Sequence, residues 1–262
     1  QEPRDEPGEP VFDCAGVPPA SEFLFGWVPG SEPTAFDAGM AMRIEPEDQL
    51  IMQVHYHTDP GAPPQSDLTK IKLHTAKQPI TEYVRVIWTG AIDINIGPGQ
   101  NSSHGSMCQV PDSAQPIKVI GVAPHMHEIG TTFATYLQRS NGVQECLVDI
   151  PRWDFEWQGS YMFEEPIVLG PGDTLRTDCG FFNTTGQQVG FGEGTGDEMC
   201  FNFVFIVDPA ESIPQFCFWP CTLLPGICEF IIDLLDVLDI LNLSRETGVP
   251  VEELLGVVPP SP

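Results

Sequence analysis

The chain has 262 residues, which is enough for one large β domain or two ordinary ones. It carries 37 Asp and Glu against 11 Lys and Arg, so its formal net charge is −26. A surface with that charge repels phosphate backbones, and no apolar run is long enough to span a bilayer, so we expect neither nucleic-acid binding nor a transmembrane segment.

The N-terminal residues "QEPRDEPGEP" (1–10) are rich in proline and acidic residues, and we expect them to be disordered. No signal peptide is visible, so we expect a mature, trimmed or partial chain. An even, scattered set of cysteines without zinc-site spacing favours disulfides, and hence a secreted, periplasmic or extracellular location. The eight are Cys14, Cys108, Cys146, Cys179, Cys200, Cys217, Cys221 and Cys228.

Short alternating runs separated by Pro and Gly follow along the chain, a pattern typical of antiparallel β-sandwiches. They cover 49–57, 83–96, 117–127, 131–138, 166–179 and 200–209. The stretch "GPGQNSSHGS" (97–106) has the composition of a linker. We therefore predict an all-β chain with one antiparallel domain at about 11–97 and another at about 104–217.

The remaining part, 218–262, has a different pattern. Within "CEFIIDLLDVLDILNLSRETG" (228–248) acidic and apolar residues repeat with helical spacing, which predicts a helical tail. Such a helix packs on its own β domain or docks on a partner chain, and the sequence leaves both open. Cys221 and Cys228 are close enough in sequence to close a small loop, with Cys146 left to pair with the tail.

Two histidines in "GVAPHMHEIG" (121–130) are candidate metal ligands. In a strand, residues two apart share a face, so His125 and His127 would present two imidazoles side by side, as metal ligands or as ordinary core histidines. Met199, in "GDEMCFNF", is a core filler or a third ligand. Two imidazoles and one thioether form a soft, incomplete ligand set that favours copper, stabilises Cu(I) and leaves a position open for dioxygen.

With these motifs in order, the chain resembles the copper type II, ascorbate-dependent monooxygenases, which include dopamine β-hydroxylase and peptidylglycine α-hydroxylating monooxygenase. The resemblance covers about residues 11–217. The matching motifs are Cys14, "QVHYH" (53–57), "HMH" (125–127), "PGD…DC" (171–179) and "DEMC" (197–200).

The resemblance implies two jelly-roll-like domains, the first incomplete, and a role for each matching residue. His125, His127 and Met199 match the oxygen-activating copper site. His55 matches one of three histidines that hold the electron-supplying copper, and Gln53 matches a residue between the two sites. The implied disulfides are Cys108–Cys217 and Cys179–Cys200.

The implied activity is hydroxylation of an activated C–H bond in a small-molecule substrate, using O2 and a one-electron reductant such as ascorbate. The family holds two coppers, and its electron-supplying site also uses an adjacent His-His pair, which does not occur in this chain. We therefore expect a chain truncated before Gln1 that binds one copper and hydroxylates poorly. The alternative is a non-catalytic copper-binding, copper-carrying or structural protein that keeps only the two-histidine, one-methionine site.

At two positions where the peptide-amidating branch of the family contacts its substrate, this chain has different residues. Ala123 stands where that branch has a carboxylate-binding arginine, and Phe203 where it has a tyrosine, so peptide amidation is not expected. Alternation in "PRWDFEWQGSYMF" (151–163) would put its aromatic residues on one face, as core or as a pocket wall. These residues are Trp153, Phe155 and Trp157.

Three further histidines have weaker signals. His57 shares the expected face of His55 and is a second ligand or none. We expect His74 to be a sheet residue. His104 lies in the expected linker, where a role between the copper sites stays open.

Overall fold

The computed structural model describes residues 22–28, 31–56, 61, 63, 66, 69–112 and 114–219. The regular elements within these ranges are all strands, and no helix occurs among them, in agreement with the predicted all-β class. The N-terminal tract 1–10, Cys14, Cys221, Cys228 and the predicted helix at 228–248 lie outside the described residues.

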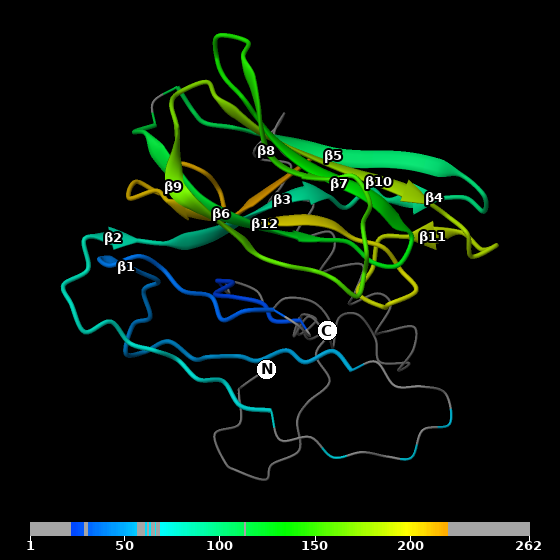
Figure 1. Cartoon of the computed structure of the whole chain (residues 1–262), viewed down its shortest axis with the longest axis horizontal. Coiled ribbons are helices and arrows are strands. Elements are labelled where there is room, and N and C mark those ends of the chain that lie inside the picture. Colours follow the sequence, from blue (N-terminus) through cyan, green and yellow to red (C-terminus); the bar gives the residue numbers. More distant parts are fainter. Residues whose placement is uncertain are drawn as a thin grey trace, which may run out of the picture.

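Two sheets form the body of the molecule (Figure 1). The first has the order β5-β10-β7-β8 and is antiparallel throughout. Its strands are β5 (Asn101–Gln109), β7 (Gly130–Gln138), β8 (Gln144–Ile150) and β10 (Thr174–Phe182). The second has the order β13-β3-β12-β6-β9, in which only the β13–β3 pair is parallel. Its strands are β3 (Arg85–Ala91), β6 (Ile117–His125), β9 (Tyr161–Leu169), β12 (Cys200–Val207) and β13 (Phe216–Trp219).

Two short pairs complete the described strands. A parallel pair joins β1 (Met40–Ala41) to β2 (Glu82–Tyr83), and an antiparallel pair joins β4 (Asn95–Ile96) to β11 (Val189–Gly190). The first of these pairs is the only strand pairing within the described residues that precede β3.

The alternating sequences become strands because one face of each sheet is buried. In β10, Leu175, Thr177, Cys179 and Phe181 are buried while the residues between them are more exposed. In the central strand β12, seven of eight residues are buried, because side chains pack on both of its faces. The alternating burial of β10 matches its alternating sequence, and the burial of both faces of β12 matches its nearly continuous run of apolar residues. Both segments can therefore be predicted as strands from the sequence.

The inner core lies between the two sheets, and two disulfides cross it. Cys108 of β5 is bonded to Cys217 of β13, and Cys179 of β10 is bonded to Cys200 of β12. Each bridge therefore joins the four-stranded sheet to the five-stranded sheet, and both implied pairings are confirmed. Cys146 is a free, exposed thiol.

An aromatic cluster covers the outer face of the five-stranded sheet. It consists of apolar side chains from β3, β6, β12 and the residue before β3: Val84, Val86, Trp88, Ile120, Phe201, Phe205 and Val207. Residues 22–42 pack over it: Phe23 stacks on Phe203 with ring centroids 4.6 Å apart, and Phe36 lies 6.2 Å from Phe205. Figure 1 shows this N-terminal segment running below the sandwich.

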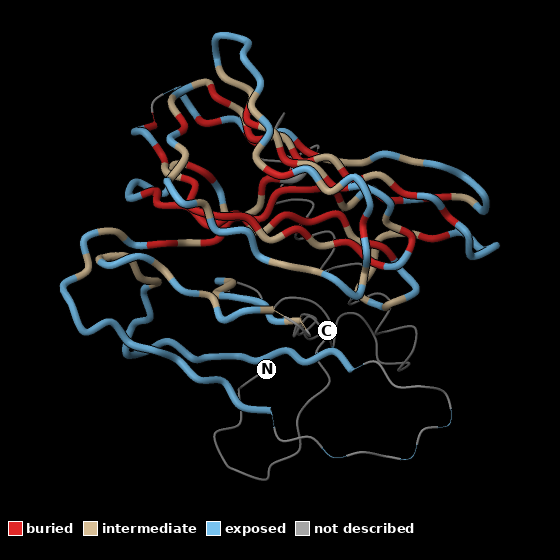
Figure 2. Tube along the Cα trace, viewed as in Figure 1, coloured by how far each residue is buried: buried red, intermediate tan, exposed pale blue. Residues whose placement is uncertain are grey.

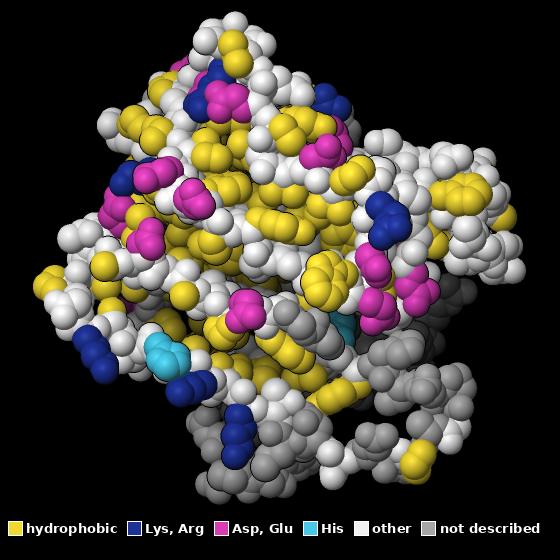
Figure 3. All heavy atoms as spheres, in the orientation of Figure 1, with side chains coloured by type: hydrophobic (Ala, Val, Ile, Leu, Met, Phe, Trp, Pro, Cys, Tyr) yellow, Lys and Arg dark blue, Asp and Glu magenta, His cyan; other side chains and the backbone are white. Residues whose placement is uncertain are grey.

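Burial divides the molecule sharply (Figure 2). None of the described residues from 22 to 83 is buried, whereas the described core consists of residues from Val84 onward, in the strands and in the loops between them. Figure 3 shows hydrophobic side chains on the surface of both parts, with acidic residues between them. The described residues include no helix capable of crossing a bilayer.

Three local predictions were wrong. Residues 49–56 form no strand, and their side chains are exposed. The expected linker at 97–106 instead contains the first half of β5, which pairs with β10 along its whole length. β3 pairs with β12, so the run at 83–91 belongs to the same sheet as the later strands, and the division of the chain into two domains stays a prediction.

The third wrong prediction concerns the aromatic stretch at 151–163. Residues 151–160 form a loop, so alternation does not apply to them. Trp153 is buried against Phe133, whereas Trp157 is 81% exposed. The turn that follows β8 breaks the period of two, which the sequence pattern could not indicate.

Candidate metal centre

The two predicted histidines lie where β6 ends beside the beginning of β12. His125 is the last residue of β6 and pairs in register with Phe201. Met126 is fully buried in the inner core, so the histidines on either side of it lie on the opposite, outer side of the sheet. The ring centroids of His125 and His127 are 5.1 Å apart, and the rings are nearly perpendicular.

Met199 directly precedes β12, which the Cys179–Cys200 bridge fixes to the other sheet. Its side chain is partly buried and packs on the outer aromatic cluster. A single carboxylate oxygen, Oε1 of Glu198, accepts the backbone N–H groups of both His127 and Met199. The backbones of His127 and Met199 are therefore hydrogen-bonded to the same oxygen atom. Convergence of the sulfur and the two imidazoles on a common point stays a prediction.

Hydrogen bonds fix which imidazole nitrogens are free. Nδ1 of His127 lies 3.0 Å from the carbonyl oxygen of Asp197, which can only accept, so Nδ1 carries the proton. The amide nitrogen of Gln158 donates to the carbonyl of Phe155, which turns its Oε1 toward Nδ1 of His125 at 2.8 Å. Both histidines thus donate from Nδ1 and keep the Nε2 lone pair for another ligand.

Both imidazoles are held in the neutral form. Burial is the largest cause that lowers the pKa of His125 to about 4, and the neighbouring His127 lowers it further. Burial also lowers the pKa of His127, against the carbonyl of Asp197, which raises it. Because metal binding requires neutral imidazole, a metal ion would not have to displace a proton from these two rings at pH 7.

Glu198 is a buried carboxylate in the same place. Burial raises its pKa to about 7, although three backbone N–H groups, from Met199, His127 and Ile129, oppose that shift. It is fully buried, and within the described part of the chain it forms no ion pair with a Lys or Arg. Its burial could not be predicted from the sequence, because an acidic residue in "DEMC" gives no sign of being buried.

The segment that carries the other matching residues lies near this site. The charge of His55 is close enough to lower the pKa of both His125 and His127, as the smallest of the causes. His55 and Gln53 are exposed. His57 lies outside the described residues, and His74 is exposed on a part of the chain that forms no strand.

His104 has partners away from the candidate ligands. It lies on β5, where Nε2 is 2.8 Å from Oγ of Ser102 and Nδ1 is 3.4 Å from Asp93. Its ring contacts Phe181 of the inner core. The structure therefore does not join it to the His125 and His127 pair.

No group of three or more His, Cys, Asp or Glu side chains in the described part of the chain is arranged to hold a metal ion. A metal at the histidine pair would therefore need a third donor of another kind, and the thioether of Met199 is that kind. Two neutral nitrogens and one sulfur suit Cu(I), so the donor set fits copper.

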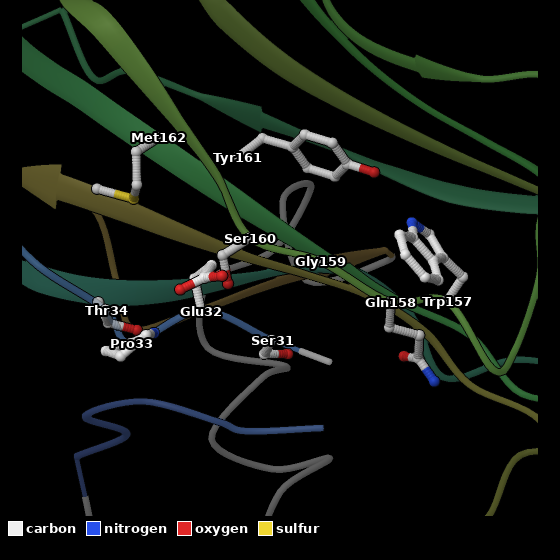
Figure 4. A pocket seen from close by; sticks show the side chains of 10 residues that line it. All are labelled: Ser31, Glu32, Pro33, Thr34, Trp157, Gln158, Gly159, Ser160, Tyr161 and Met162. Carbon is white, nitrogen blue, oxygen red and sulfur yellow. The ribbon is translucent and has the colours of Figure 1, made fainter. Parts of the chain in front are cut away.

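A groove of about 270 Å³ lies beside His125 (Figure 4). The N-terminal segment supplies one wall and the loop and strand at 157–162 supply the other. Figure 4 shows the ring of Trp157 and the amide of Gln158 on opposite sides of the chain. Gln158, missed by the sequence analysis, connects the groove to the ring of His125. The lining residues are Ser31, Glu32, Pro33, Thr34, Trp157, Gln158, Gly159, Ser160, Tyr161 and Met162.

Curated relatives are distant and longer. DBH-like monooxygenase protein 2 of Mus musculus is 26% identical over 221 residues, covering 74% of this chain and 35% of the relative. Tyramine beta-hydroxylase of Caenorhabditis briggsae is 23% identical over 211 residues, covering 73% and 35%. Dopamine beta-hydroxylase of Canis lupus familiaris is 25% identical over 172 residues, covering 59% and 26%. The chain spans less than half the length of the curated relatives it matches.

A family model matches residues 84–222, which is more than half of the chain. Its description is "Copper type II ascorbate-dependent monooxygenase, C-terminal domain". The matched range begins one residue before β3 and includes both disulfides and the whole histidine and methionine region. This chain belongs to the copper type II ascorbate-dependent monooxygenase family.

Proposed function

We propose that this chain is the part of a copper-dependent monooxygenase that activates dioxygen and hydroxylates a C–H bond. The observation that supports this most is the pair of neutral imidazoles, each with its Nδ1 proton donated to a fixed acceptor. Met199 lies beside them, and its backbone N–H donates to the carboxylate of Glu198, which also accepts the backbone N–H of His127. Family membership supplies the reaction class.

His125, His127 and Met199 would hold the copper. When bound, copper would supply dioxygen binding and one-electron chemistry at this position. Gln158 and the carbonyl of Asp197 orient the two rings through their Nδ1 protons, so each ring presents Nε2 without a rearrangement. Met199 is partly buried among apolar side chains, which would limit the access of water to the copper.

His55 and Gln53 belong to the electron-supplying side in this proposal. Ascorbate or another small reductant would deliver one electron to each of the two coppers of the complete enzyme. His55 is one of three histidines that such a second site needs, so the residues of this chain alone would hold one copper. Its electrostatic influence on both His125 and His127 supports a position facing them.

A small-molecule substrate would bind in the groove beside His125. Gln158 contacts both the groove and the metal-binding ring, which brings the substrate and the copper to adjacent positions. Phe203 lies 6.3 Å from the His125 ring and offers an apolar surface where the peptide-amidating branch has a tyrosine. The names of two relatives suggest tyramine and dopamine as first substrates to try.

The wider organisation is also a proposal. Two jelly-roll-like domains would divide before β3, because β3 pairs with β12 and the family match begins at residue 84. Residues 11 to about 83 would then be part of the first domain. The tail after β13 would contain the helix expected at 228–248 and would dock on its own domain or on a partner chain. The two disulfides support a secreted or other extracellular location.

A non-catalytic copper-binding or structural protein is the second candidate. It is favoured by one observation: the printed chain contains no adjacent His-His pair for the electron-supplying site. The two candidates share the copper site at His125, His127 and Met199 and differ in turnover.

Copper counting followed by turnover tests the proposal. The purified chain is titrated with Cu(I) against a chromogenic chelator, and one tight copper per chain is expected. His125→Ala should remove that binding, whereas His74→Ala, a change of an exposed histidine on the N-terminal segment, should not. Equal binding by wild type and His125→Ala contradicts the assignment.

Oxygen consumption with ascorbate and tyramine then separates the two candidates. Coupled formation of one hydroxylated product per O2 consumed supports the monooxygenase. Because this chain alone would hold one copper, product is measured over a single turnover of the Cu(I)-loaded chain, with excess ascorbate as the electron source. Tight copper binding without any hydroxylated product at that level supports the non-catalytic protein.

A further inference from the structure

The carboxylate of Glu198 occupies a special position between the two parts of the candidate copper site. It lies one residue before Met199 and forms a bridge with Phe191 through its backbone. Its own N–H donates to the carbonyl of Gly190 at 2.9 Å, which anchors its main chain to β11. The side chain then points to the loop that follows β6.

Three backbone N–H groups converge on this carboxylate. Oε1 accepts from His127 and, at 2.9 Å, from Met199, and Oε2 accepts from Ile129 at 3.1 Å. The partners come from two segments that are distant in the sequence, the loop after β6 and the residue before β12, and the described pairing of β6 with β12 begins only at His125 and Phe201. One carboxylate therefore ties the backbone of a candidate histidine ligand to the backbone of the candidate methionine ligand.

A fully buried carboxylate is costly to keep, and its partners here are neutral N–H groups rather than a cation. A thioether on a flexible side chain is a weak ligand unless its backbone is fixed. The disulfide at Cys200 fixes Met199 from the side of the inner core, and Glu198 fixes it from the side of the histidine loop.

We propose that Glu198 is a positioning residue that sets the separation of His127 and Met199 and so determines the affinity of the copper site for Cu(I). This inference rests on the proposed function, since it assumes that these residues bind copper. Glu198 itself would not touch the metal: both of its oxygens are occupied by backbone N–H groups.

The sharpest variant is Glu198→Gln, which keeps the shape of the side chain. It replaces one oxygen by an NH2 group, so at least one of the three N–H groups meets a donor instead of an acceptor. Asp173→Asn is the matched control, because Asp173 is also buried and also accepts backbone N–H groups, from Ser140 at 2.8 Å and from Gly170 at 3.0 Å. Its contacts lie away from the candidate copper ligands: Gly170 is in the turn between β9 and β10, and Ser140 and the ion-paired Arg139 are in the turn between β7 and β8.

Two measurements on the full chain test the inference. In the metal-free protein, hydrogen exchange at the amides of His127, Ile129 and Met199 should be faster in Glu198→Gln than in wild type or Asp173→Asn. With Cu(I) alone as the probe, competition with a chelator should show an affinity loss of about tenfold or more for Glu198→Gln and less than about twofold for Asp173→Asn. X-ray absorption should show a lost or weakened copper–sulfur contribution in Glu198→Gln, with the nitrogen neighbours retained.

The outcomes are distinguishable. Unchanged amide exchange in Glu198→Gln overturns the positioning role, even when the wild-type protein binds copper. Wild-type Cu(I) affinity with an intact copper–sulfur contribution in a correctly folded Glu198→Gln protein overturns it as well. Absence of Cu(I) binding in the wild-type protein overturns the proposed function itself, and with it the effect of Glu198 on copper.

Discussion

The sandwich from residue 84 to 219 and the N-terminal segment from 22 to 83 are built differently. The sandwich contains every buried residue of the described chain, two disulfides and all long strands. The described residues of the segment include two short strands and no buried residue, although many of their side chains are apolar. Those that are large and exposed include Trp27, Leu50, Ile51, Met52, Val54, Tyr56, Ile71 and Leu73.

This difference shows that apolar composition alone does not make a stable unit. Side chains contribute to stability when they leave water, and those of the segment remain largely in contact with it. Phe23 and Phe36 are among the residues of the segment that pack on the outer face of the sandwich. The candidate copper ligands therefore lie on the buried, disulfide-linked sandwich. His55 lies on the N-terminal segment, whose position depends on contacts with the sandwich.

The largest expected effect contrasts one aromatic side chain from each region. Phe133→Ala removes a fully buried ring of the inner core and should lower the free energy of unfolding by about 3–5 kcal/mol. Trp27→Ala removes a ring that is 66% exposed and should change it by less than about 0.5 kcal/mol. Urea unfolding followed by circular dichroism measures both, and similar losses in the two variants would remove the distinction between the regions.

The bridge beside Met199 gives the next effect. Replacing both Cys179 and Cys200 by Ser opens a link with a sequence separation of 21 and should cost about 3 kcal/mol of stability. Cys146→Ser, at the free exposed thiol, is the control and should be nearly neutral. The same proteins titrated with Cu(I) should show a weakened site only in the bridge variant. Undiminished copper affinity without the bridge would mean that Glu198 alone is sufficient to hold Met199.

The next prediction concerns how the stability of the metal-free protein depends on pH through His125. The folded protein keeps His125 neutral down to about pH 4, while the unfolded chain protonates this residue below about pH 6.5. The contribution of His125 to stability should therefore fall by about 2–3 kcal/mol as the pH drops from 6.5 to 4. Glu198 works in the opposite direction, because its pKa is raised to about 7 in the folded state, so protonation on the way down favours folding.

The two effects are separated by subtraction. Unfolding free energies of wild type and His125→Gln are measured at several pH values, and their difference isolates His125. The difference should decrease toward pH 4. A difference that does not vary with pH would show that His125 is not kept neutral by burial.

The smallest effect concerns the attachment of the segment. Phe23→Ala removes the stacking on Phe203 and the edge contact with Trp88, at 4.6 and 5.3 Å, and should cost about 1 kcal/mol. Phe25→Ala, two residues away and more exposed, is the control and should be nearly neutral. Hydrogen exchange of residues 31–56 should rise in Phe23→Ala alone, and equal rates in both variants would mean that other contacts hold the segment.

Local periodicity predicted the strands that have both a buried face and a partner, such as β10 and β12. It failed at 49–56, because an alternating run becomes a strand only when a neighbouring backbone accepts its hydrogen bonds. It also failed at β5, whose Gly and Ser content looks like a linker. Gly105 is required there by close packing: a Cβ at this position would lie 2.0 Å from the carbonyl oxygen of Thr177.

The site was only partly predictable for a similar reason. The histidine pair and the methionine are visible as residue types at a recognisable spacing. Glu198 and Gln158 act through contacts between segments that are far apart in the sequence, 71 and 33 residues from their histidine partners. Neither residue has a local pattern that indicates its burial or its partner, so only the fold reveals them.

The bridge between Cys179 and Cys200 has a consequence for how the protein is made. Before that bond forms, two thiols stand next to Met199, and thiolates are stronger Cu(I) ligands than a thioether. Copper supplied to the reduced chain would be captured by sulfur at the wrong residues. Oxidation removes those competitors and fixes the start of β12 in the same event. If the proposed copper site is occupied in the cell, oxidative folding would precede metallation, and copper would be delivered at or after the step that forms the bond.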